Sequence, residues 1–332
     1  MLKILGYSSG GIILCVLLLW GYTNIPIKTP EKDFSLGTTF SLHYATEIGL
    51  DWQKVYVAML EDLGVRKVRL PVYWNRIEEK EGTYDYTQVD WQVRMAEKYD
   101  AKLIMVVGQK VPRWPECFIP AWAQDDTEKR RAALLRFITK TITRYENSLA
   151  VVAWQVENEP FLPYGICPSF DKDFLDQEIA VARGADPSRP IVVTDSGELS
   201  IWVPAAKRAD IFGTTMYRTV YTQEYGYYEY PVGPRFFQLK RALIRMIADQ
   251  QNAIVIELQG EPWLAGVTTE ASLDDQLENL NAKKLRENVL FARQSGFSEA
   301  YLWGVEWWYW LKETQGEESL WNEAKDLYQT WP

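Results

Sequence analysis

The stretch VVAWQVENEP, residues 151–160, decides how this chain folds and where its chemistry lies. An apolar run of the kind that forms a buried parallel strand ends abruptly in Glu-Asn-Glu-Pro. Burial of the apolar residues stabilises a fold, whereas a carboxylate at the end of the strand must stay solvated or hydrogen-bonded and adds little stability. We therefore expect the acidic residues that close this strand to serve chemistry rather than packing.

Further apolar runs of strand length alternate with amphipathic stretches of helix length along the chain. The predicted strands are 34–41, 67–72, 102–108, 150–156, 191–195, 211–217, 253–257 and 300–304. The predicted helices are 51–63, 87–99, 127–146, 171–183, 235–250 and 277–295. Nearly continuous apolar strands joined by helices predict an α/β fold, a closed (β/α)8 TIM barrel over residues 34–332. An open doubly wound sheet is the alternative, but no early strand leads into the Gly-rich phosphate turn that such a sheet favours.

The first residues differ in character from the rest of the chain. Lys3 precedes an uncharged span from Ile4 to Asn24, and this span contains a dense apolar run over residues 12–20. We expect residues 1–24 to form a signal anchor or single transmembrane helix with Cys15 buried in the membrane, followed by a linker over residues 25–33. No small-residue cleavage site follows the run, which favours an uncleaved anchor. The positive charge near the start predicts a cytoplasmic N-terminus and a membrane-anchored, extracytoplasmic catalytic body, or a secreted one if the segment is cleaved.

The composition of the chain limits the classes of function and of catalytic group that it can have. A net charge of −9, with acidic and basic residues interspersed, argues against nucleic-acid binding. A single His and three Cys leave no His-built zinc site, and they allow a Ser-His-Asp triad only through His43. Carboxylates remain as the acid–base groups, so we expect no metal, no organic cofactor and no obligate protein partner. The 15 Trp suit stacking on sugar rings, although a large core would also use them.

The carboxyl ends of parallel barrel strands meet at one face, where active sites of such barrels collect. Acidic and aromatic residues are concentrated at these strand ends in the sequence. The candidate site residues there are His43, Arg69, Trp114, Asn158, Glu159, Tyr217, Glu257 and Trp303.

Two of these strand ends resemble a known family. Asn158-Glu159-Pro160 closes the fourth strand and Ile254-Val-Ile-Glu257 closes the seventh, as in the clan A glycoside hydrolases, the (β/α)8 group that includes family 5 cellulases and family 42 β-galactosidases. Arg69, Tyr217 and Trp303 also fall where that clan keeps groups that support the substrate and the nucleophile. The resemblance covers residues 34–330. It implies a retaining glycosidase that works by double displacement, and the aromatic-rich loops favour a β-linked oligo- or polysaccharide as the substrate.

The chemistry of acetal cleavage assigns the expected roles. The leaving oxygen needs a proton, and the reacting carbon needs a nucleophile on the opposite face of the sugar ring. We expect Glu159 to be the general acid/base and Glu257 the nucleophile, with the resemblance implying a carboxyl separation of about 5 Å. Arg69 is the cation expected beside the nucleophile. Asn158 is expected to hydrogen-bond the sugar hydroxyl next to the reacting carbon.

Other residues compete for these roles. Glu157 is an alternative acid, and Glu261 is an alternative nucleophile in the loop after the seventh strand. We expect Glu198 and Glu306 to be binding or solvated loop acids. The structural alternatives are a turn residue for Asn158, a packing residue at the rim for Tyr217 and a satisfied rim histidine for His43.

Aromatic residues at the strand ends are expected to form the walls of the site. Trp303 is the expected stacking platform, and Tyr217 is expected to donate a hydrogen bond to the nucleophile. The additional walls expected from their positions are Trp74, Trp114, Trp263, Trp307 and Trp308.

Cys117 and Cys167 lie in the loops after the third and fourth strands, which are neighbours in a barrel. They would form a disulfide in an oxidising compartment and remain free thiols in the cytoplasm. Two rival functions use the same scaffold. A membrane-tethered transglycosidase would use identical residues, and an inactive carbohydrate-binding barrel would have lost one carboxylate.

Overall fold

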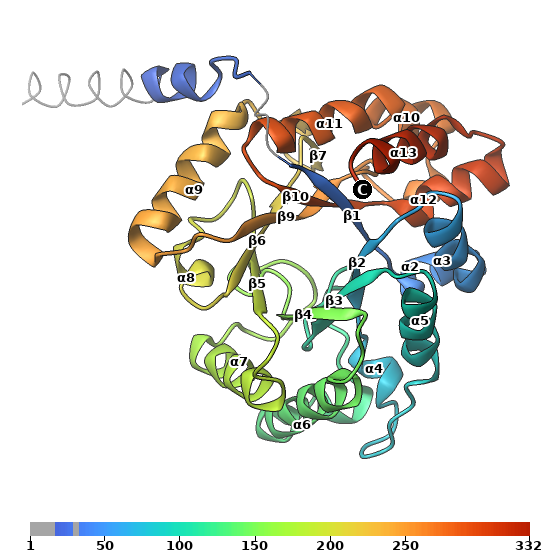
Figure 1. Ribbon diagram of the computed structural model, residues 1–332, viewed down its shortest axis with the longest axis vertical. Helices are drawn as coiled ribbons and strands as arrows, with labels where there is room; N and C mark the ends of the chain where they lie inside the picture. The colour runs from blue at the N-terminus through green and yellow to red at the C-terminus, as the bar shows by residue number, and fades with distance from the viewer. Residues whose placement is uncertain (1–16, 29–32) are drawn as a thin grey trace, which may run out of the picture.

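The structure is a computed structural model that describes residues 17–28 and 33–332. Parallel strands close into a barrel in the order β1-β10-β9-β6-β5-β4-β3-β2, which confirms the predicted (β/α)8 fold (Figure 1). The barrel strands are β1 (Ser35–Thr39), β2 (Lys67–Pro71), β3 (Lys102–Val107), β4 (Val151–Val156), β5 (Ile191–Asp195), β6 (Ile211–Met216), β9 (Ala253–Gln259) and β10 (Glu299–Trp303).

Helices surround the barrel (Figure 1), and the longer ones bury apolar residues in the core that covers the strands. The helices are α2 (Leu42–Glu47), α3 (Trp52–Glu61), α4 (Trp74–Ile77), α5 (Thr87–Lys98), α6 (Thr127–Tyr145), α7 (Lys172–Ala185), α8 (Val203–Ala206), α9 (Pro234–Ala248), α10 (Leu273–Asn279), α11 (Ala282–Gln294), α12 (Val305–Trp310) and α13 (Ser319–Thr330). Short turns of other helix types cover Ala121–Ala123, Thr268–Glu270 and Leu311–Gln315. Several helices begin at an acidic or amide side chain that accepts hydrogen bonds from otherwise unpaired backbone N–H groups, as Asp51 and Asp126 do.

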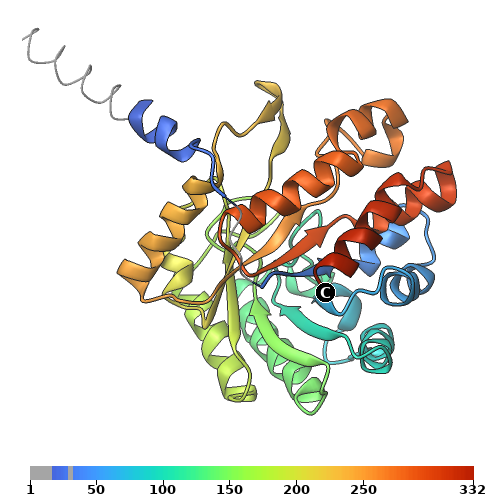
Figure 2. The same cartoon turned by 45° about the horizontal axis from the view of Figure 1, so that its top comes forward.

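Two connections differ from the prediction. The single helix expected over 277–295 is two helices, because Asn281 caps α11 by accepting a hydrogen bond from the backbone N–H of Lys284. The loop after β6 contains an antiparallel hairpin of β7 (Thr219–Thr222) and β8 (Gly226–Glu229), which projects from the body of the molecule (Figure 2). The connection after β5 carries only the four-residue helix α8.

The barrel interior is divided along its axis. A small apolar cluster fills part of the interior, contributed by five strands: Ile104, Ala153, Val192, Ile256 and Tyr301. Gly37 of β1 leaves the space that the Tyr301 ring needs, because a Cβ at residue 37 would lie 2.6 Å from that ring. Beyond this layer, towards the carboxyl ends of the strands, the interior side chains become polar, and these side chains form the candidate site.

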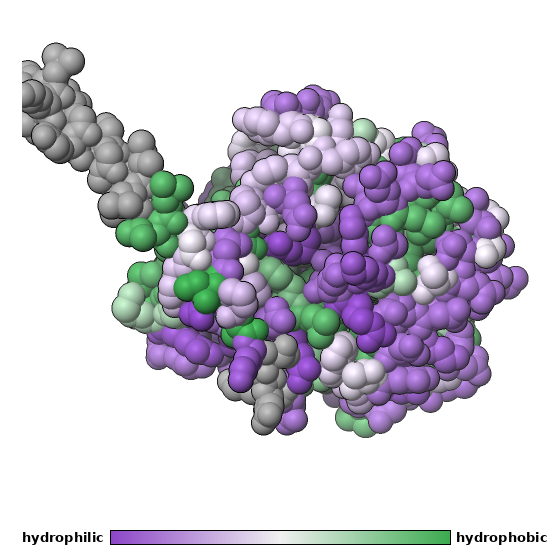
Figure 3. Space-filling model, turned by 90° about the horizontal axis from the view of Figure 1, so that it is seen from above, coloured by the Kyte–Doolittle hydropathy of each residue, from purple (hydrophilic) through white to green (hydrophobic). Residues whose placement is uncertain are grey.

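The amino-terminal segment leads away from the barrel. Its described part is helical over residues 17–23, and Trp20 Nε1 donates a hydrogen bond to the Pro231 carbonyl (2.8 Å) near the start of α9. Leu17, Leu18 and Leu19 are more than half exposed, and Figure 3 shows hydrophobic atoms where the described chain begins. Within residues 17–28 and 33–332, no helix combines the length and apolar character that a membrane span requires. Residues 1–16 of the expected anchor, including Cys15, lie outside the described residues.

Candidate active site

A cleft of about 720 Å³ opens at the carboxyl ends of the barrel strands. Its walls come from the loops after most of the strands. The lining residues include Tyr44, Glu47, Arg113, Trp114, Glu116, Glu159, Glu198, Tyr217, Glu257, Glu261, Trp263 and Trp303. Most of the candidate residues predicted at the strand ends are therefore brought together.

Glu257 reaches the cleft because β9 contains a bulge. Ile254 and Ile256 face the apolar cluster inside the barrel, so strict alternation would turn residue 257 outwards. The pairing of β9 shifts by one residue against β6 between Val255 and Glu257, and against β10 between Val255 and Leu258. The extra residue re-aims Glu257 into the cleft, as bulges beside active sites commonly do.

The Glu257 carboxylate is held by two strong donors. Arg69 Nη1 donates to Oε2 at 2.7 Å, and Tyr217 Oη donates to Oε1 at 2.5 Å. Glu257 is 5% exposed and Arg69 is fully buried. A guanidinium and a phenol hydroxyl both favour a negative charge on the carboxylate that accepts from them.

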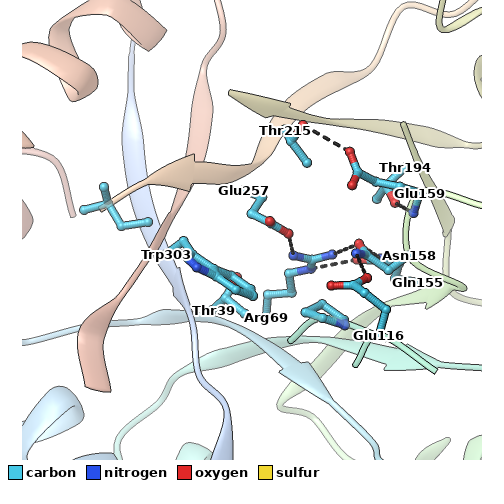
Figure 4. A network of polar contacts seen from close by, with 12 residues as sticks. Thr39, Arg69, Glu116, Gln155, Asn158, Glu159, Thr194, Thr215, Glu257 and Trp303 are labelled. Carbon is cyan, nitrogen blue, oxygen red and sulfur yellow. Dashed lines mark hydrogen bonds and ion pairs between the residues drawn. The ribbon is translucent and has the colours of Figure 1, made fainter. Parts of the chain in front are cut away.

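Arg69 organises the floor of the site. Its Nε donates to Gln155 Oε1 at 2.9 Å, and its Nη2 donates to Asn158 Oδ1 at 2.6 Å (Figure 4). The guanidinium of Arg69 on β2 therefore connects Glu257 on β9 to Gln155 on β4 and to Asn158 just after β4. A planar fork with several fixed donors is suited to this role, and Lys could not reproduce it.

Replacing Tyr217 with Phe tests the hydrogen bond to Glu257. Loss of a hydrogen bond to a charged group removes roughly 1.5–3 kcal/mol, so we expect kcat/KM to fall about 10- to 100-fold. The ring stays in place, so the urea unfolding midpoint should change little. An unchanged kcat/KM would assign Tyr217 to packing at the rim.

Glu159 has the opposite electrostatic environment. Its backbone has a positive φ of 41°, and its N–H donates to Thr194 Oγ1 at 2.8 Å. Thr215 Oγ1 donates to Glu159 Oε1 at 3.1 Å, and no basic side chain of the described residues pairs with this carboxyl. Burial, followed by the negative charges of Glu257 and Glu116, raises the pKa of Glu159 well above its usual range. Glu159 is therefore suited to hold a proton.

The turn after β4 separates Glu157 from Glu159. Glu157 also has a positive φ, 57°, and its carboxylate accepts from the backbone N–H groups of Gln109 (2.8 Å) and Lys110 (2.7 Å). It lies in a smaller pocket with Glu178 of α7, outside the cleft, and burial raises its pKa. The alternative assignment of Glu157 as the acid is therefore wrong, because Glu157 does not line the cleft. Two non-Gly residues in left-handed conformations are uncommon, and such strain is concentrated at functional sites.

Glu261 lies in the cleft but is tied to other groups. Its carboxylate forms an ion pair with Arg113, and Oε1 accepts from Trp303 Nε1 at 2.7 Å. Arg113 also pairs with Glu306 at 3.0 Å. With Arg113 held 3.9 Å from the centre of a Trp303 ring, one face of the expected stacking platform is already covered by the guanidinium.

Several predicted placements are wrong. Glu306 is not a solvated loop acid, because it is completely buried and accepts from the Ser41 backbone N–H. Glu198, in contrast, lies half-buried in the cleft wall, which is compatible with the expected binding role, and burial raises its pKa to about 8. His43 does not line the cleft: it lies on α2 in contact with Arg76 Nη2 (3.1 Å) and the ring of Phe118. Burial lowers the pKa of His43 to about 4, as expected for a packed rim histidine.

The aromatic walls are divided between cleft and core. Trp114, Trp263 and Trp303 line the cleft, and Trp114 is 57% exposed. The remaining expected walls are fully buried core residues: Trp74, Trp307 and Trp308. The choice between core and cleft depends on short helices α4 and α12, which begin directly after their strands and turn these side chains outwards from the cleft.

The cleft residues that the sequence did not indicate include Glu47, Arg113 and Glu116. Glu116 lies in the loop after β3, is 7% exposed, and accepts a hydrogen bond from Asn158 Nδ2 at 3.1 Å (Figure 4). Burial and the charge of Glu257 raise its pKa to about 7. The sequence around it, Trp114-Pro-Glu-Cys117, shows no pattern that would have indicated a third cleft carboxylate.

Cys117 and Cys167 form the expected disulfide, with their Cα atoms 5.3 Å apart. The bond joins the loop after β3 to the loop after β4, next to Glu116. Replacing both cysteines with Ser should lower the free energy of unfolding by about 2–4 kcal/mol, because the bond closes a loop of 50 residues in the unfolded chain. Urea unfolding measures this, and an unchanged midpoint would contradict it.

Comparisons with known proteins agree with this geometry. Residues 29–229 match the model of the family described as cellulase, glycosyl hydrolase family 5. The chain belongs to glycosyl hydrolase family 5. The expected clan A membership and the expected class of enzyme, a glycosidase, are thereby confirmed at the level of the family. The match includes β4 and Glu159 but ends before β9 and Glu257.

Two curated relatives share parts of the chain. A probable mannan endo-1,4-beta-mannosidase A of Aspergillus niger is 26% identical over 125 residues, which cover 33% of this chain and 30% of that protein. Beta-galactosidase BgaA of Clostridium cellulovorans is 23% identical over 216 residues, which cover 58% of this chain and 32% of that protein. The chain thus spans about a third of the length of these relatives.

Solved structures share the fold. A beta-galactosidase from the haloarchaeon Halorubrum lacusprofundi superimposes with a TM-score of 0.58 at 15% identity, covering 90% of this chain and 58% of that one. A GH10 endoxylanase from a sugarcane soil metagenome also gives a TM-score of 0.58, at 16% identity, and covers 89% of this chain and 97% of that one. At these identities the likeness concerns the barrel alone.

Proposed function

We propose that this protein is a retaining glycoside hydrolase that cleaves a β-linked oligo- or polysaccharide by double displacement. One observation carries the proposal: two carboxyl groups in opposite electrostatic environments, Glu159 and Glu257, line the same cleft from β4 and β9. Enzymes that need an acid and a base at one pH separate the two roles in this way. The relatives named for β-mannan and β-galactoside cleavage support a β-linked substrate.

The first step forms a glycosyl-enzyme. Glu257 attacks the anomeric carbon while the bond to the leaving oxygen breaks, and Glu159 gives that oxygen its proton. Arg69 and Tyr217 hold the attacking carboxylate in place. Asn158 is fixed beside them by Arg69, and it is the group we assign to the sugar hydroxyl next to the reacting carbon.

The second step hydrolyses the intermediate. Glu159, now ionised, takes a proton from water, and the water oxygen attacks the anomeric carbon and releases Glu257. Two inversions give net retention of configuration. NMR of the product from an aryl β-glycoside should show the β-anomer first. Initial appearance of the α-anomer would overturn the proposal.

Hydrolysis is favoured over the rival functions for separate reasons. An inactive carbohydrate-binding barrel would not need both carboxyl groups in one cleft with opposite environments. A transglycosidase would use the same residues, and it is distinguished by products that lengthen when an acceptor sugar is added. Hydrolysis predicts release of reducing sugar without such an acceptor.

We also propose that residues 1–24 anchor the protein in a membrane, with the barrel outside the cytoplasm. The apolar run 12–20 and the exposed Leu17, Leu18 and Leu19 support this. The Cys117–Cys167 disulfide supports an oxidising compartment. In membrane fractions washed with alkaline carbonate, the protein should stay with the membrane, and added protease should digest the barrel from the extracytoplasmic side. Release into the wash would contradict the anchor.

A further inference from the structure

The loop after β3 holds Glu116 in a fixed position. Its backbone has a positive φ of 72°, its N–H donates to the Arg113 carbonyl (2.7 Å), and its carbonyl accepts from Val111 N–H (2.8 Å). The next residue, Cys117, is joined to the neighbouring loop by the disulfide to Cys167. Residues in this backbone region persist only where the surrounding structure fixes them.

The loop after β4 closes against Glu116 from the other side. Gly165 has a φ of 90°, and a Cβ at this position would lie 2.5 Å from the Glu116 Cβ. Ile166 N–H donates to the Pro115 carbonyl at 3.0 Å. Both loops therefore pack around the stem of Glu116 and leave only its carboxylate in the cleft.

Of the two oxygens of the Glu116 carboxylate, one accepts a hydrogen bond from the described residues. Oε2 accepts from Asn158 Nδ2 at 3.1 Å, whereas Oε1 has no hydrogen-bond partner among residues 17–28 and 33–332. The side chain is more than nine-tenths buried, and Figure 4 shows its carboxylate directed towards Arg69 and Asn158. Oε1 is open to the cleft rather than sealed inside the protein, so it is available to a hydrogen-bond donor on a ligand.

The basic side chains near Glu116 are committed elsewhere. The Arg69 guanidinium donates hydrogen bonds to Glu257, Gln155 and Asn158. Lys110 Nζ donates to the backbone carbonyls of Glu159 (3.1 Å) and Leu162 (2.8 Å). Of the three carboxyl groups in this part of the cleft, Glu159 is assigned to hold a proton and Glu257 is paired with Arg69, whereas Glu116 has no basic partner among the described residues. An ionised Glu116 therefore favours a positively charged ligand group.

Resting on the proposed function, we propose that Glu116 determines substrate specificity by binding a protonated amine on the carbon next to the reacting carbon. The substrate class is a 2-amino-2-deoxy-β-glycoside. Asn158 is assigned to the substituent on that carbon, and its amide is already bonded to Glu116, so the free Oε1 lies beside the same substituent. An ammonium supplies several donors and a positive charge, whereas a hydroxyl supplies one donor and no charge. An N-acetyl group would remove the charge.

The test compares matched pairs of aryl glycosides on the full-length protein. Each pair is the 4-nitrophenyl β-glycoside of glucose or galactose and its 2-amino-2-deoxy counterpart, measured at a pH where the amine is protonated. Wild-type kcat/KM should favour the amino sugar by at least about tenfold. Glu116→Gln should reduce that preference by at least about tenfold, mainly through KM, and Glu116→Asp should restore part of it.

A matched control removes the same charge from the edge of the same cleft. Glu47 is exposed there, and Glu47→Gln should leave the preference unchanged. A wild-type enzyme without a preference for the amino sugar, or one whose preference survives Glu116→Gln, would overturn the inference and leave the glycosidase proposal standing.

A binding measurement distinguishes failure of this inference from failure of the proposed function. Calorimetry of the wild type and Glu116→Gln with methyl 2-amino-2-deoxy-β-glucoside and methyl β-glucoside does not require turnover. Tighter binding of the amino sugar that depends on Glu116 would support the inference even if no glycoside in the panel were hydrolysed. Equal binding of both sugars, or binding of neither, would overturn it.

Discussion

Replacing Glu257 with Gln is expected to lower kcat by about 10⁴-fold or more, because an amide cannot supply the attacking carboxylate. Gln keeps the shape of Glu, its amide oxygen can still accept from Arg69, and its NH2 group can donate to the Tyr217 hydroxyl oxygen. The fold should therefore survive, and circular dichroism with urea unfolding verifies that it does. Steady-state kinetics with an aryl β-glycoside measures the loss.

Glu261→Gln is the matched control for this variant. Glu261 also lines the cleft, but its carboxylate is paired with Arg113 and accepts a hydrogen bond from Trp303, so we assign it a structural role. We expect a loss at least about 100-fold smaller than that of Glu257→Gln, since no transition-state bond is removed. Full activity in Glu257→Gln, with activity lost in Glu261→Gln, would assign the nucleophile to Glu261.

The second large effect is expected for Glu159→Ala. Without the acid, glycosides with poor leaving groups should lose about 10²- to 10⁴-fold in kcat/KM, whereas 2,4-dinitrophenyl glycosides should still form the glycosyl-enzyme. Added azide should restore turnover of the dinitrophenyl substrate and release a β-glycosyl azide, because azide needs no general base and fits the space left by the carboxyl group.

The pH profile gives an independent readout of the same residue. Burial and neighbouring negative charge raise the pKa of Glu159, so its acid form persists to a higher pH than in an ordinary Glu. Activity should fall on the alkaline side as Glu159 loses its proton, and Glu159→Ala should abolish that alkaline limb. Glu157→Gln is the control, and it should show neither azide rescue nor loss of the limb, because Glu157 lies outside the cleft.

The barrel could be predicted because its strands are buried on both sides. Runs such as residues 102–108 and 150–156 are apolar without alternation, and this pattern with helical connections leaves few architectures. The strand ends alone placed Glu159 and Tyr217 in the cleft, and Arg69 and Asn158 in the hydrogen-bond network beside it. The disulfide also followed from strand adjacency, since β3 and β4 are neighbours.

Other features depend on local geometry that no periodicity encodes. Strand alternation alone would have turned Glu257 away from the cleft, and its placement depends on the bulge in β9. Glu116 depends on a loop conformation with a positive φ and on packing against Gly165. Trp307 and Trp308 follow a strand end in sequence, yet α12 places both in the core, so proximity in sequence to the site did not predict contact with it.

The most direct test of the account is to identify the residue that carries the glycosyl group. Glu159→Ala incubated with a 2,4-dinitrophenyl β-glycoside should accumulate the intermediate, because the base that activates water is missing. Mass spectrometry of the intact protein should show the mass of one glycosyl group, and peptic peptide mapping should place it on Glu257. A glycosyl group on Glu261 or Glu116, or turnover without any adduct together with inversion at the anomeric carbon, would contradict the account.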